Sequence, residues 1–473
     1  MQPSRRDYLL GLASFVAAGA SARGERVDPI AGTWSATTTD NKGFTQRLKI
    51  VITAEGKGSL ILVDESNISI PASLGELSNS DVNIEWKSVG FAFKGVLKND
   101  AIEGAMSAAA AGESQAVTFV RGDLFAAAIP ALPPGVMDRK RLHRLRLIAG
   151  APAMGVAWAF VSGKDHVLVD GLRAADAKTQ VALADQWHIG SCTKSMTATL
   201  AARLVEGGHI KWEATVGEIL GPHLPPFNAA YKDATLLQLL AHYSGLPHDV
   251  TGSDKYGRGP RPDIRAERLQ YVAAALNEAP VVPPGKQDSY SNAGYVVAGA
   301  MLECMVDKPW EELMRAHVFV PLGMQSAGFG PPGHPGKGDQ PVGHAPGAGG
   351  KLRPVTKPEE ADSPPVNGPC GSVHLNLRDL LAYLKTHRDR PASFLSEASW
   401  RTLHTVPFGG NFALGWLVKP DGTLNHTGSN GLWWANVVIT PAGLAFAATM
   451  NAVTPGTTAV ITQALDAAGR SRE

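Results

Sequence analysis

The pattern of apolar residues changes near residue 138, and this change limits the chain to folds built from two unlike parts. Residues 27–122 carry short runs of β-branched and aromatic residues, which Gly, Asn and Asp separate at short intervals. The candidate strands are Gln46–Thr53, Ser59–Val63, Val82–Trp86, Phe91–Leu97 and Ala116–Val120. Closely spaced short strands are typical of antiparallel sheets and small barrels. We therefore expect a small β-rich accessory domain over residues 27–122.

The second part, residues 138–473, mixes helices with strands. A proline-rich linker over residues 123–137 precedes it, and Leu142, Leu145 and Ile148 then share one face of a helix. The expected strands are Met154–Val161, His166–Val169, Leu424–Thr427, Leu432–Ile439 and Leu444–Met450, and the expected helices are Ser191–Glu206, Leu236–His242, Asn292–Val306 and Thr457–Ala467. Residues 330–369 are roughly half Gly and Pro, which predicts a long extended loop that controls the shape of a pocket. A chain of 473 residues is too long for one hydrophobic core, so we expect two folded domains.

The first 22 residues have the features of an export signal. Arg5-Arg6 follows a polar start, an apolar run extends from Tyr8 to Ala18, and Ala20-Ser21-Ala22 offers small residues for cleavage. The order Ser4-Arg5-Arg6 resembles a twin-arginine signal. We expect residues 1–22 to be a signal peptide and the mature protein to be periplasmic or secreted. No later apolar run is long enough for a stable membrane span after leader removal.

Composition argues against several classes of function. Acidic and basic residues balance to a formal net charge of +1, so neither nucleic acid nor an anionic membrane surface is an expected partner. Three cysteines, Cys192, Cys304 and Cys370, are too few for a disulfide framework, and we expect small buried thiols. His334 and His344 have no cysteine or paired acidic ligands nearby, so we expect loop residues and no metal site. No cofactor is implied, and the oligomeric state is open.

The only Ser-x-x-Lys motif of the chain is Ser191-Cys192-Thr193-Lys194, at the start of an apolar helix. Residues three apart share a helix face, so the Lys194 ammonium can lie beside the Ser191 hydroxyl. Serine needs a base to act as a nucleophile, and a shielded lysine near a helix N-terminus can serve as one. The Ser191 N–H could then stabilise an oxyanion. Alone, the motif favours an ordinary helix start with Ser191 as its N-cap.

Two further motifs carry candidate chemistry. Tyr290-Ser291-Asn292 is the only Tyr-x-Asn of the chain, and a tyrosine hydroxyl near a lysine can relay protons while an amide both donates and accepts. The alternative is a packed tyrosine followed by an Asn helix cap. His426-Thr427-Gly428-Ser429 lies on a late strand, where a glycine lets substrate approach the backbone and the Ser429 N–H can be a second oxyanion donor. His426 alone would more often be structural.

The three motifs in this order resemble the serine β-lactamase and penicillin-binding superfamily. Tyr-Ser-Asn in place of Ser-Asp-Asn points to the branch of class C β-lactamases, D,D-carboxypeptidases, D-aminopeptidases and related esterases. Flanking segments are similar too: 187–190, 239–247, 321–324 and 413–416. The resemblance covers residues 138–470. Separately, and more weakly, Gly32-Thr33-Trp34, Phe93-Lys94-Gly95 and Ile102-Glu103-Gly104 give residues 27–122 a lipocalin-like look, with a spacer or ligand-carrier role.

The resemblance implies an α+β fold: an antiparallel sheet flanked by helices plus a helical subdomain, here preceded by the small all-β domain. It implies acylation of Ser191, proton transfer by Lys194 and Tyr290, and substrate positioning by Asn292. The strand with His426, Thr427, Gly428 and Ser429 would form the opposite wall, with the Ser191 and Ser429 amides binding the oxyanion. Expected substrates are small molecules or cell-wall peptides.

His426 departs from class C β-lactamases, which usually carry lysine at this position. A lysine is a permanent cation that helps to bind a β-lactam carboxylate, whereas a histidine is only partly charged near neutral pH. His-Thr-Gly therefore favours the D,D-carboxypeptidase-like or esterase-like members over an efficient β-lactamase. The Trp433-Trp434 pair would either line an acyl pocket or pack in the core. A non-hydrolytic cell-wall or penicillin-binding sensor is the alternative function.

Overall fold

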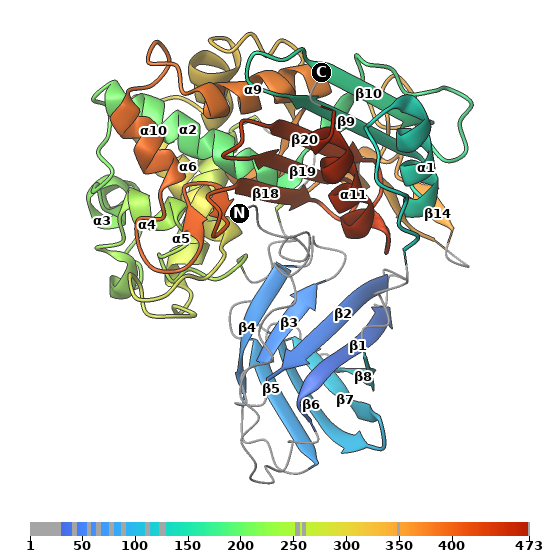
Figure 1. Ribbon diagram of the computed structural model, residues 1–473. Coiled ribbons are helices and arrows are strands. Elements are labelled where there is room, and N and C mark those ends of the chain that lie inside the picture. The colour runs from blue at the N-terminus through green and yellow to red at the C-terminus, as the bar shows by residue number, and fades with distance from the viewer. Residues whose placement is uncertain are drawn as a thin grey trace, which may run out of the picture.

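The computed structural model describes residues 30–39, 45–53, 58–62, 68–74, 80–86, 91–108, 114–122, 129–250, 256–257, 262–347 and 351–471. The predicted signal peptide and residues 123–128 of the predicted linker lie outside these residues. Two separate bodies are visible in Figure 1, a barrel below and a larger body of helices and sheet above.

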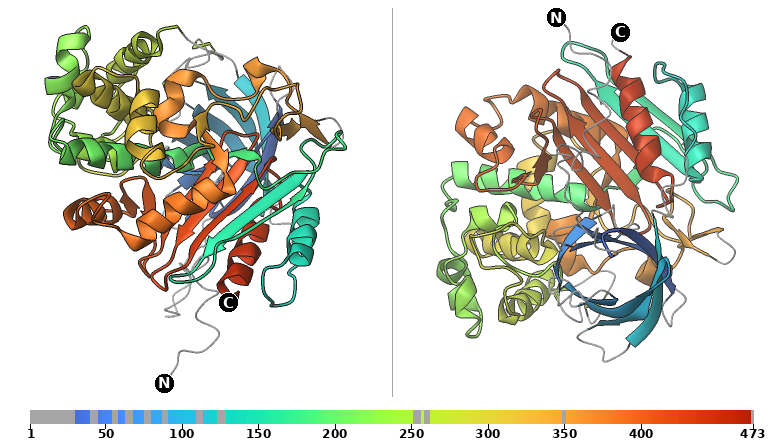
Figure 2. Two further views of the ribbon diagram at one scale, coloured as in Figure 1. Left: turned by 90° about the horizontal axis from the view of Figure 1, so that it is seen from above. Right: turned by 60° about the horizontal axis from the view of Figure 1, so that its bottom comes forward.

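Eight antiparallel strands form the closed barrel, which Figure 2 shows end-on in its right view. They are β1 (Gly32–Thr39), β2 (Thr45–Ile52), β3 (Gly58–Leu62), β4 (Ile68–Leu74), β5 (Asp81–Trp86), β6 (Phe91–Lys98), β7 (Ala101–Ala108) and β8 (Ser114–Arg121). Pairing of Ser35 with Val120 joins the first strand to the last. In β5, Val82, Ile84 and Trp86 are buried while the residues between them face outward, as the two-residue period of a strand requires. The barrel therefore encloses an apolar interior.

A seven-stranded antiparallel sheet is the centre of the larger body, in the order β10-β9-β20-β19-β18-β17-β16. The strands are β9 (Ala153–Ala159), β10 (His166–Gly171), β16 (Phe412–Ala413), β17 (Trp416–Val418), β18 (Leu424–Ser429), β19 (Trp434–Ile439) and β20 (Ala445–Met450). Every residue of β9, β19 and β20 is buried, because helices cover both faces of the sheet. Met154, Val156 and Trp158 pack toward α1 (Arg139–Ala149) and α11 (Thr457–Gly469), and the alternate residues pack toward the opposite face.

The remaining helices gather on that opposite face, where the long helices α2 and α6 lie next to each other (Figure 1). They are α2 (Thr193–Glu206), α3 (Val216–Leu220), α4 (Leu236–Leu240), α5 (Ile264–Asn277), α6 (Asn292–Val306), α7 (Trp310–Met314), α8 (Gly368–Gly371), α9 (Leu377–Asp389) and α10 (Glu397–His404). Short strands β11 (Gln186–His188), β12 (Gly328–Phe329) and β15 (Val373–Asn376) form a second small sheet. The predicted helix Asn292–Val306 has the bounds of α6, and it is buried along most of its length.

Residues 330–369 are less extended than the Gly and Pro content predicts. They include the hairpin of β13 (His344–Pro346) and β14 (Leu352–Pro354), and short helical turns at Pro358–Glu360 and Pro365–Asn367. His344 is therefore a buried strand residue and not a loop residue; its Nδ1 bonds to the Asn451 carbonyl at 2.7 Å. Within the described ranges, no helix has both the length and the apolar character needed to cross a membrane.

Candidate active site

Ser191 lies in a tight 3-10 turn, Gly190–Cys192, that leads directly into α2. The N-cap of α2 is Cys192, which makes no side-chain capping bond, so Ser191 is not the helix cap that the motif alone could have meant. Its hydroxyl instead accepts a hydrogen bond from Lys194 Nζ at 3.2 Å. Gly190 holds the turn at φ +49°, a left-handed conformation that favours glycine. The turn thus presents the hydroxyl to Lys194, as the Ser-x-x-Lys spacing predicts.

Lys194 is fully buried and uses all three of its N–H groups. Besides Ser191, Nζ donates to Asn292 Oδ1 at 2.6 Å and to the backbone carbonyl of Cys370 at 2.8 Å. An ammonium group has three donors and no acceptor, so this set of partners matches its charged form. The Cys370 carbonyl comes from α8, which Thr197 Oγ1 anchors by donating to the Pro369 carbonyl at 2.7 Å. The structure therefore fixes the Lys194 amine beside Ser191.

Tyr290 contacts this cation through its ring. Lys194 Nζ lies 4.9 Å from the ring centroid, which is within the range of a cation–π contact. The ring also packs against His242, with centroids 4.3 Å apart. Ser291, and not Asn292, is the N-cap of α6, since Ser291 Oγ accepts from Gly294 N at 2.8 Å. Asn292 is left free of a capping role and binds Lys194.

Asp249 extends the hydrogen-bonded chain beyond Asn292, and no sequence motif indicated it. Asn292 Nδ2 donates to Asp249 Oδ2 at 3.1 Å, and His248 Nδ1 contacts the same oxygen at 2.6 Å. Loss of solvent around Asp249 acts to raise its pKa, but His248, Asn292 and Lys194 outweigh this, so the pKa lies below its ordinary value. The hydrogen-bonded chain therefore runs from Lys194 through Asn292 to the Asp249 carboxylate.

Strand β18 brings His426, Thr427, Gly428 and Ser429 to the other side of Ser191. A Cβ added to Gly428 would lie 2.0 Å from the Ile189 carbonyl and 2.7 Å from Ser191 N, so only glycine fits there. A Cβ on Gly190 would likewise lie 2.3 Å from Ser429 N. The backbones that carry the Ser191 and Ser429 amides are thus in direct contact. Thr427 Oγ1 accepts from Asn436 Nδ2 at 2.9 Å.

His426 is buried and neutral at neutral pH. Its Nδ1 lies 2.7 Å from the Gly415 carbonyl, which can only accept, so the Nδ1 position carries the proton. Burial, reinforced by the charge of Lys194, lowers the pKa of His426 to about 4. The sequence suggested a partly charged histidine; the structure corrects this, because the imidazole has lost its water and sits near a buried cation.

The cysteines and tryptophans near these motifs are not catalytic groups. All three cysteines are free, and Cys192 and Cys370 are buried while Cys304 is only half-buried, contrary to the prediction for that residue. Burial raises the pKa of Cys370 to about 12, so its thiol is inert at neutral pH. Trp433 and Trp434 are buried in the cores on the two faces of the sheet, which favours packing over an acyl pocket.

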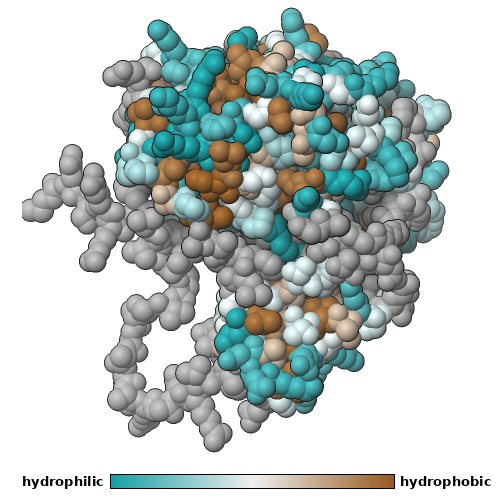
Figure 3. Space-filling view, turned by 90° about the vertical axis from the view of Figure 1, so that its right-hand side faces the viewer, coloured by the Kyte–Doolittle hydropathy of each residue, from teal (hydrophilic) through white to brown (hydrophobic). Residues whose placement is uncertain are grey.

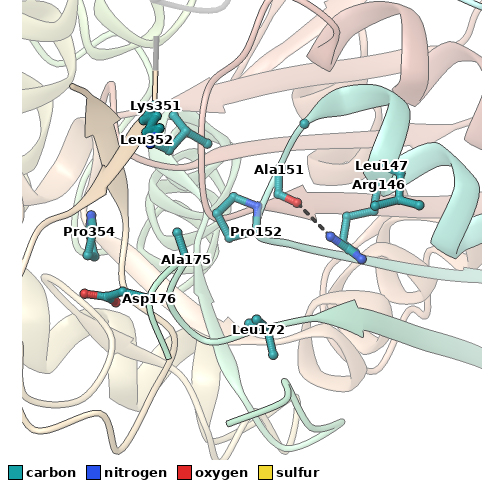
Figure 4. A pocket seen from close by; sticks show the side chains of 11 residues that line it. Arg146, Leu147, Ala151, Pro152, Leu172, Ala175, Asp176, Lys351, Leu352 and Pro354 are labelled. Carbon is teal, nitrogen blue, oxygen red and sulfur yellow. Dashed lines mark hydrogen bonds between the residues drawn. The ribbon is translucent and has the colours of Figure 1, made fainter. Parts of the chain in front are cut away.

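A surface hollow of about 620 Å³ lies elsewhere, between α1, the segment after β10 and the β13–β14 hairpin. Figure 4 shows Arg146, Ala151, Leu172, Lys351 and Pro354 around it. Arg146 is already bonded to Asp170 and to the Ala151 carbonyl, and none of the predicted site residues lines the hollow. On the face seen in Figure 3, apolar side chains form small groups between hydrophilic ones. The candidate active site therefore remains the cluster around Ser191.

Within the described ranges, no group of three or more His, Cys, Asp or Glu could hold a metal ion.

The family model named Beta-lactamase matches residues 146–469, about two thirds of the chain. The chain belongs to the beta-lactamase family. All the residues of the Ser191 cluster, including Asp249 and the β18 residues, fall within the matched range. The cluster therefore lies in the part of the chain that carries the family membership.

Two curated relatives illustrate the match within the family. The chain is 28% identical over 189 residues to penicillin-binding protein 4 of Amycolatopsis lactamdurans, and the match covers 40% of this chain and 48% of the relative. It is 26% identical over 209 residues to the D-alanyl-D-alanine-carboxypeptidase/endopeptidase AmpH of Escherichia coli K12, which covers 43% of this chain and 51% of that protein. The chain thus spans about half the length of these relatives.

Solved structures agree on the fold of the larger body. The octameric penicillin-binding protein homologue from Pyrococcus abyssi matches with a TM-score of 0.56 and 24% identity, over 70% of this chain and 77% of that chain. The D-amino acid amidase from Ochrobactrum anthropi SV3 matches with a TM-score of 0.57 and 19% identity, over 71% of this chain and 98% of the amidase. This beta-lactamase family member therefore shares its mixed architecture of sheet and helices with both solved structures.

Proposed function

We propose that the chain is an exported serine hydrolase that acts on a peptide, amide or ester substrate through an acyl-enzyme on Ser191. The observation that carries this proposal is the Ser191 hydroxyl bonded to the buried Lys194 cation, at a turn packed against the backbone of β18. A hydroxyl used only for structure would cap the helix or bond to a backbone carbonyl. Ser191 does neither among the described residues and faces a charged group instead.

The reaction has two halves. Ser191 Oγ bonds to the acyl carbon, the carbonyl electron pair moves onto its oxygen, and the Ser191 and Ser429 N–H groups stabilise that oxyanion. Collapse of the intermediate expels the alcohol or amine, which takes up the proton that Ser191 released. Water then repeats the attack on the acyl carbon and frees the acid and Ser191.

Tyr290 is the group to which we assign the proton transfer. Lys194 Nζ is bonded to the Ser191 hydroxyl and to two carbonyl oxygens, which fits an ammonium, and an ammonium has no lone pair with which to take the Ser191 proton. It can instead polarise the Ser191 hydroxyl and stabilise a negative oxygen on Tyr290, whose ring it contacts. Asn292 then has two roles: it positions Lys194, as the structure has it, and it binds substrate, as the motif predicts.

The neutral state of His426 favours esters and amides over substrates that must be bound by a charged carboxylate. With its proton on Nδ1, the imidazole offers a hydrogen-bonding nitrogen and no positive charge at neutral pH. The carboxypeptidase/endopeptidase name of the E. coli relative supports a peptide as one substrate class, and weak β-lactam hydrolysis is a further activity to test. We also propose that the barrel is an accessory domain and that residues 1–22 direct twin-arginine export.

A substrate panel tests the proposal. The purified mature protein is incubated with a fluorescent penicillin, a chromogenic short-chain ester and a D-alanyl-D-alanine peptide, beside Ser191→Ala. We expect labelling or turnover that depends on Ser191. If nothing labels or turns over, or if Ser191→Ala behaves like the parent, the hydrolase proposal is wrong, and a non-hydrolytic cell-wall or penicillin-binding sensor becomes the better account.

A further inference from the structure

Behind the Ser191 turn, one buried carboxylate joins the two backbone segments that meet at the site. Asp362 comes from the Gly/Pro-rich region, and its side chain is only 6% exposed. Its Oδ2 accepts from His188 Nε2 at 3.0 Å, and its Oδ1 accepts from Asn430 Nδ2 at 2.9 Å and from Ser363 N at 2.7 Å. His188 lies two residues before Gly190, the first residue of the nucleophile turn, and Asn430 directly follows β18.

The first arm fixes the strained turn at Gly190. His188 is fully buried, and its Nδ1 accepts the Gly190 N–H at 3.2 Å. An imidazole nitrogen that accepts carries no proton, so the proton of His188 lies on Nε2 and points at Asp362. Asp362 therefore determines which nitrogen of His188 can receive the Gly190 N–H. This bond supports the left-handed φ of +49° that orients the Ser191 amide.

The second arm fixes the end of β18. With its NH₂ group bound to Asp362, Asn430 turns its Oδ1 to the backbone N–H groups of Leu432 and Trp433, at 3.2 and 3.1 Å. The same turn is braced by Ser429 Oγ, which donates to the Trp433 carbonyl at 2.7 Å. These bonds hold the backbone that carries the Ser429 N–H against Gly190.

We infer that Asp362 is a positioning residue for the proposed oxyanion hole, which it aligns from both sides through His188 and Asn430. The inference rests on the proposed acyl-enzyme function. Asp362 touches no reacting atom; it acts by keeping two amides, from segments more than 230 positions apart, at one spacing. Donors fixed in advance are effective in an oxyanion hole because they need no reorganisation when charge develops.

Asp362→Asn is the sharpest test, because an amide cannot satisfy both arms. His188 Nε2, Ser363 N and Asn430 Nδ2 all donate to the carboxylate. The oxygen of the new amide can accept from one arm, but its NH₂ group then faces a donor on the other arm. If the proton of His188 moved from Nε2 to Nδ1, Nε2 could accept from the new amide, but Nδ1 could no longer accept the Gly190 N–H. Exchanging the pair, in Asp362→Asn with Asn430→Asp, restores a donor facing an acceptor at His188 and at residue 430, and it leaves only the Ser363 N–H without its acceptor. Asp379→Asn is the matched control, since the Asp379 carboxylate also accepts a backbone N–H and a hydroxyl, from Ser326, away from Ser191.

The readout is the ratio of kcat/KM for p-nitrophenyl acetate to that for its thionoester, in which sulfur replaces the carbonyl oxygen. Sulfur is larger and a poorer hydrogen-bond acceptor, so a damaged oxyanion hole slows the oxygen ester selectively. For Asp362→Asn we expect kcat on the oxygen ester to fall about 10²-fold with KM within about threefold, and the ratio to fall about tenfold or more. The exchange variant should recover most of that ratio, and Asp379→Asn should keep the parent ratio.

The failures of the two proposals are distinguishable. If the parent shows no Ser191-dependent turnover of either ester, the hydrolase proposal itself is wrong. If the parent is active but Asp362→Asn retains its ratio, or the exchange variant is no better than Asp362→Asn, Asp362 does not position the oxyanion hole. Should Asp362→Asn fail to fold, Asn430→Ala removes only the β18 arm and must lower the same ratio; an unchanged ratio there would equally overturn the inference.

Discussion

The barrel and the larger body bury different chemistry. Among the barrel residues whose burial the structure describes, Ser35 is the one buried polar residue, and the other buried residues are hydrophobic, among them Trp34, Trp86 and Phe93. The larger body buries a lysine, an arginine, several carboxylates and a series of histidines, and all 14 histidines of the chain lie at residue 143 or beyond. Burying polar groups is costly unless each finds a partner. A region that keeps so many in bonded networks is where selection for reactivity, beyond folding, is expected.

The nucleophile prediction gives the largest expected contrast between the two parts. Ser191→Ala should lower kcat/KM by about 10⁴-fold or more, because no other hydroxyl can take its place. Ser35→Ala removes the buried serine of the barrel, whose hydroxyl donates to the Gly122 carbonyl, and should cost about 1 kcal/mol of stability with turnover unchanged. Ester hydrolysis and thermal unfolding of both variants check this. Comparable losses of turnover in the two would mean that the comparison is wrong.

The next largest effect concerns the proton. Tyr290→Phe keeps the ring on Lys194 and His242 but removes the hydroxyl, so we expect kcat to fall by about 10² to 10⁴-fold. The control is Tyr295→Phe, which removes a buried hydroxyl that donates to the Leu240 carbonyl at 2.6 Å. That variant should lose stability with little loss of kcat. Single-turnover acylation rates separate the two, and a fully active Tyr290→Phe would return proton transfer to Lys194.

Acid should weaken the larger body before the barrel. Burial lowers the folded pKa of His374 and of His426 to about 4 each, below the value of about 6.5 in an unfolded chain. Between those values the unfolded state binds more protons, so the stability is complete above pH 6.5 and is lost as the pH falls toward 4. At pH 4.5, each histidine should have lowered the free energy of unfolding by on the order of 2–3 kcal/mol relative to neutral pH.

Hydrogen exchange at pH 7.5 and 4.5, corrected for intrinsic rates, measures this in both parts of one molecule. The barrel has no histidine and serves as the internal control. Protection should drop in β18 and β15 while it is retained in β1–β8. Equal loss in both parts would show that buried histidines do not set the acid sensitivity.

The smallest effect sharpens the substrate assignment. His426→Lys introduces a permanent cation, and we expect the preference for carboxylate-bearing over neutral substrates to rise about tenfold. His143→Lys changes an exposed histidine on α1 and should leave the preference as it was. In the parent, activity from pH 5 to 8 should not decline because of His426, since its pKa of about 4 lies below that range. A parent rate on acidic substrates that falls as the pH rises through this range would restore a cationic role.

The motifs predicted those contacts of the candidate site that depend on residue type and local spacing. Ser191 and Lys194 meet because three residues span one helical turn, and α6 begins at Asn292 because Ser291 caps it. The site elements that need distant partners left no pattern in the sequence. The carboxylate of Asp362 lies 174 positions from His188, and the third acceptor of Lys194 is a backbone carbonyl, which any residue at position 370 would supply.

Ionisation was the other property that the sequence could not supply. The charge of His426 depends on its burial and on the nearby Lys194, and neither can be read from the triplet His-Thr-Gly. Similarly, glycine and proline content predicted an extended loop at residues 330–369, but backbone pairing in β13–β14 and the bonds of Asp362 give this region defined structure.

The most direct test of the account is to trap the intermediate. A slowly deacylating penicillin or activated ester is mixed with the protein, the reaction is quenched, and the intact and digested masses are measured. The account predicts one acyl group per chain, on the peptide that contains Ser191, and none in Ser191→Ala. An acyl group on another residue, or turnover that persists in Ser191→Ala, would contradict it.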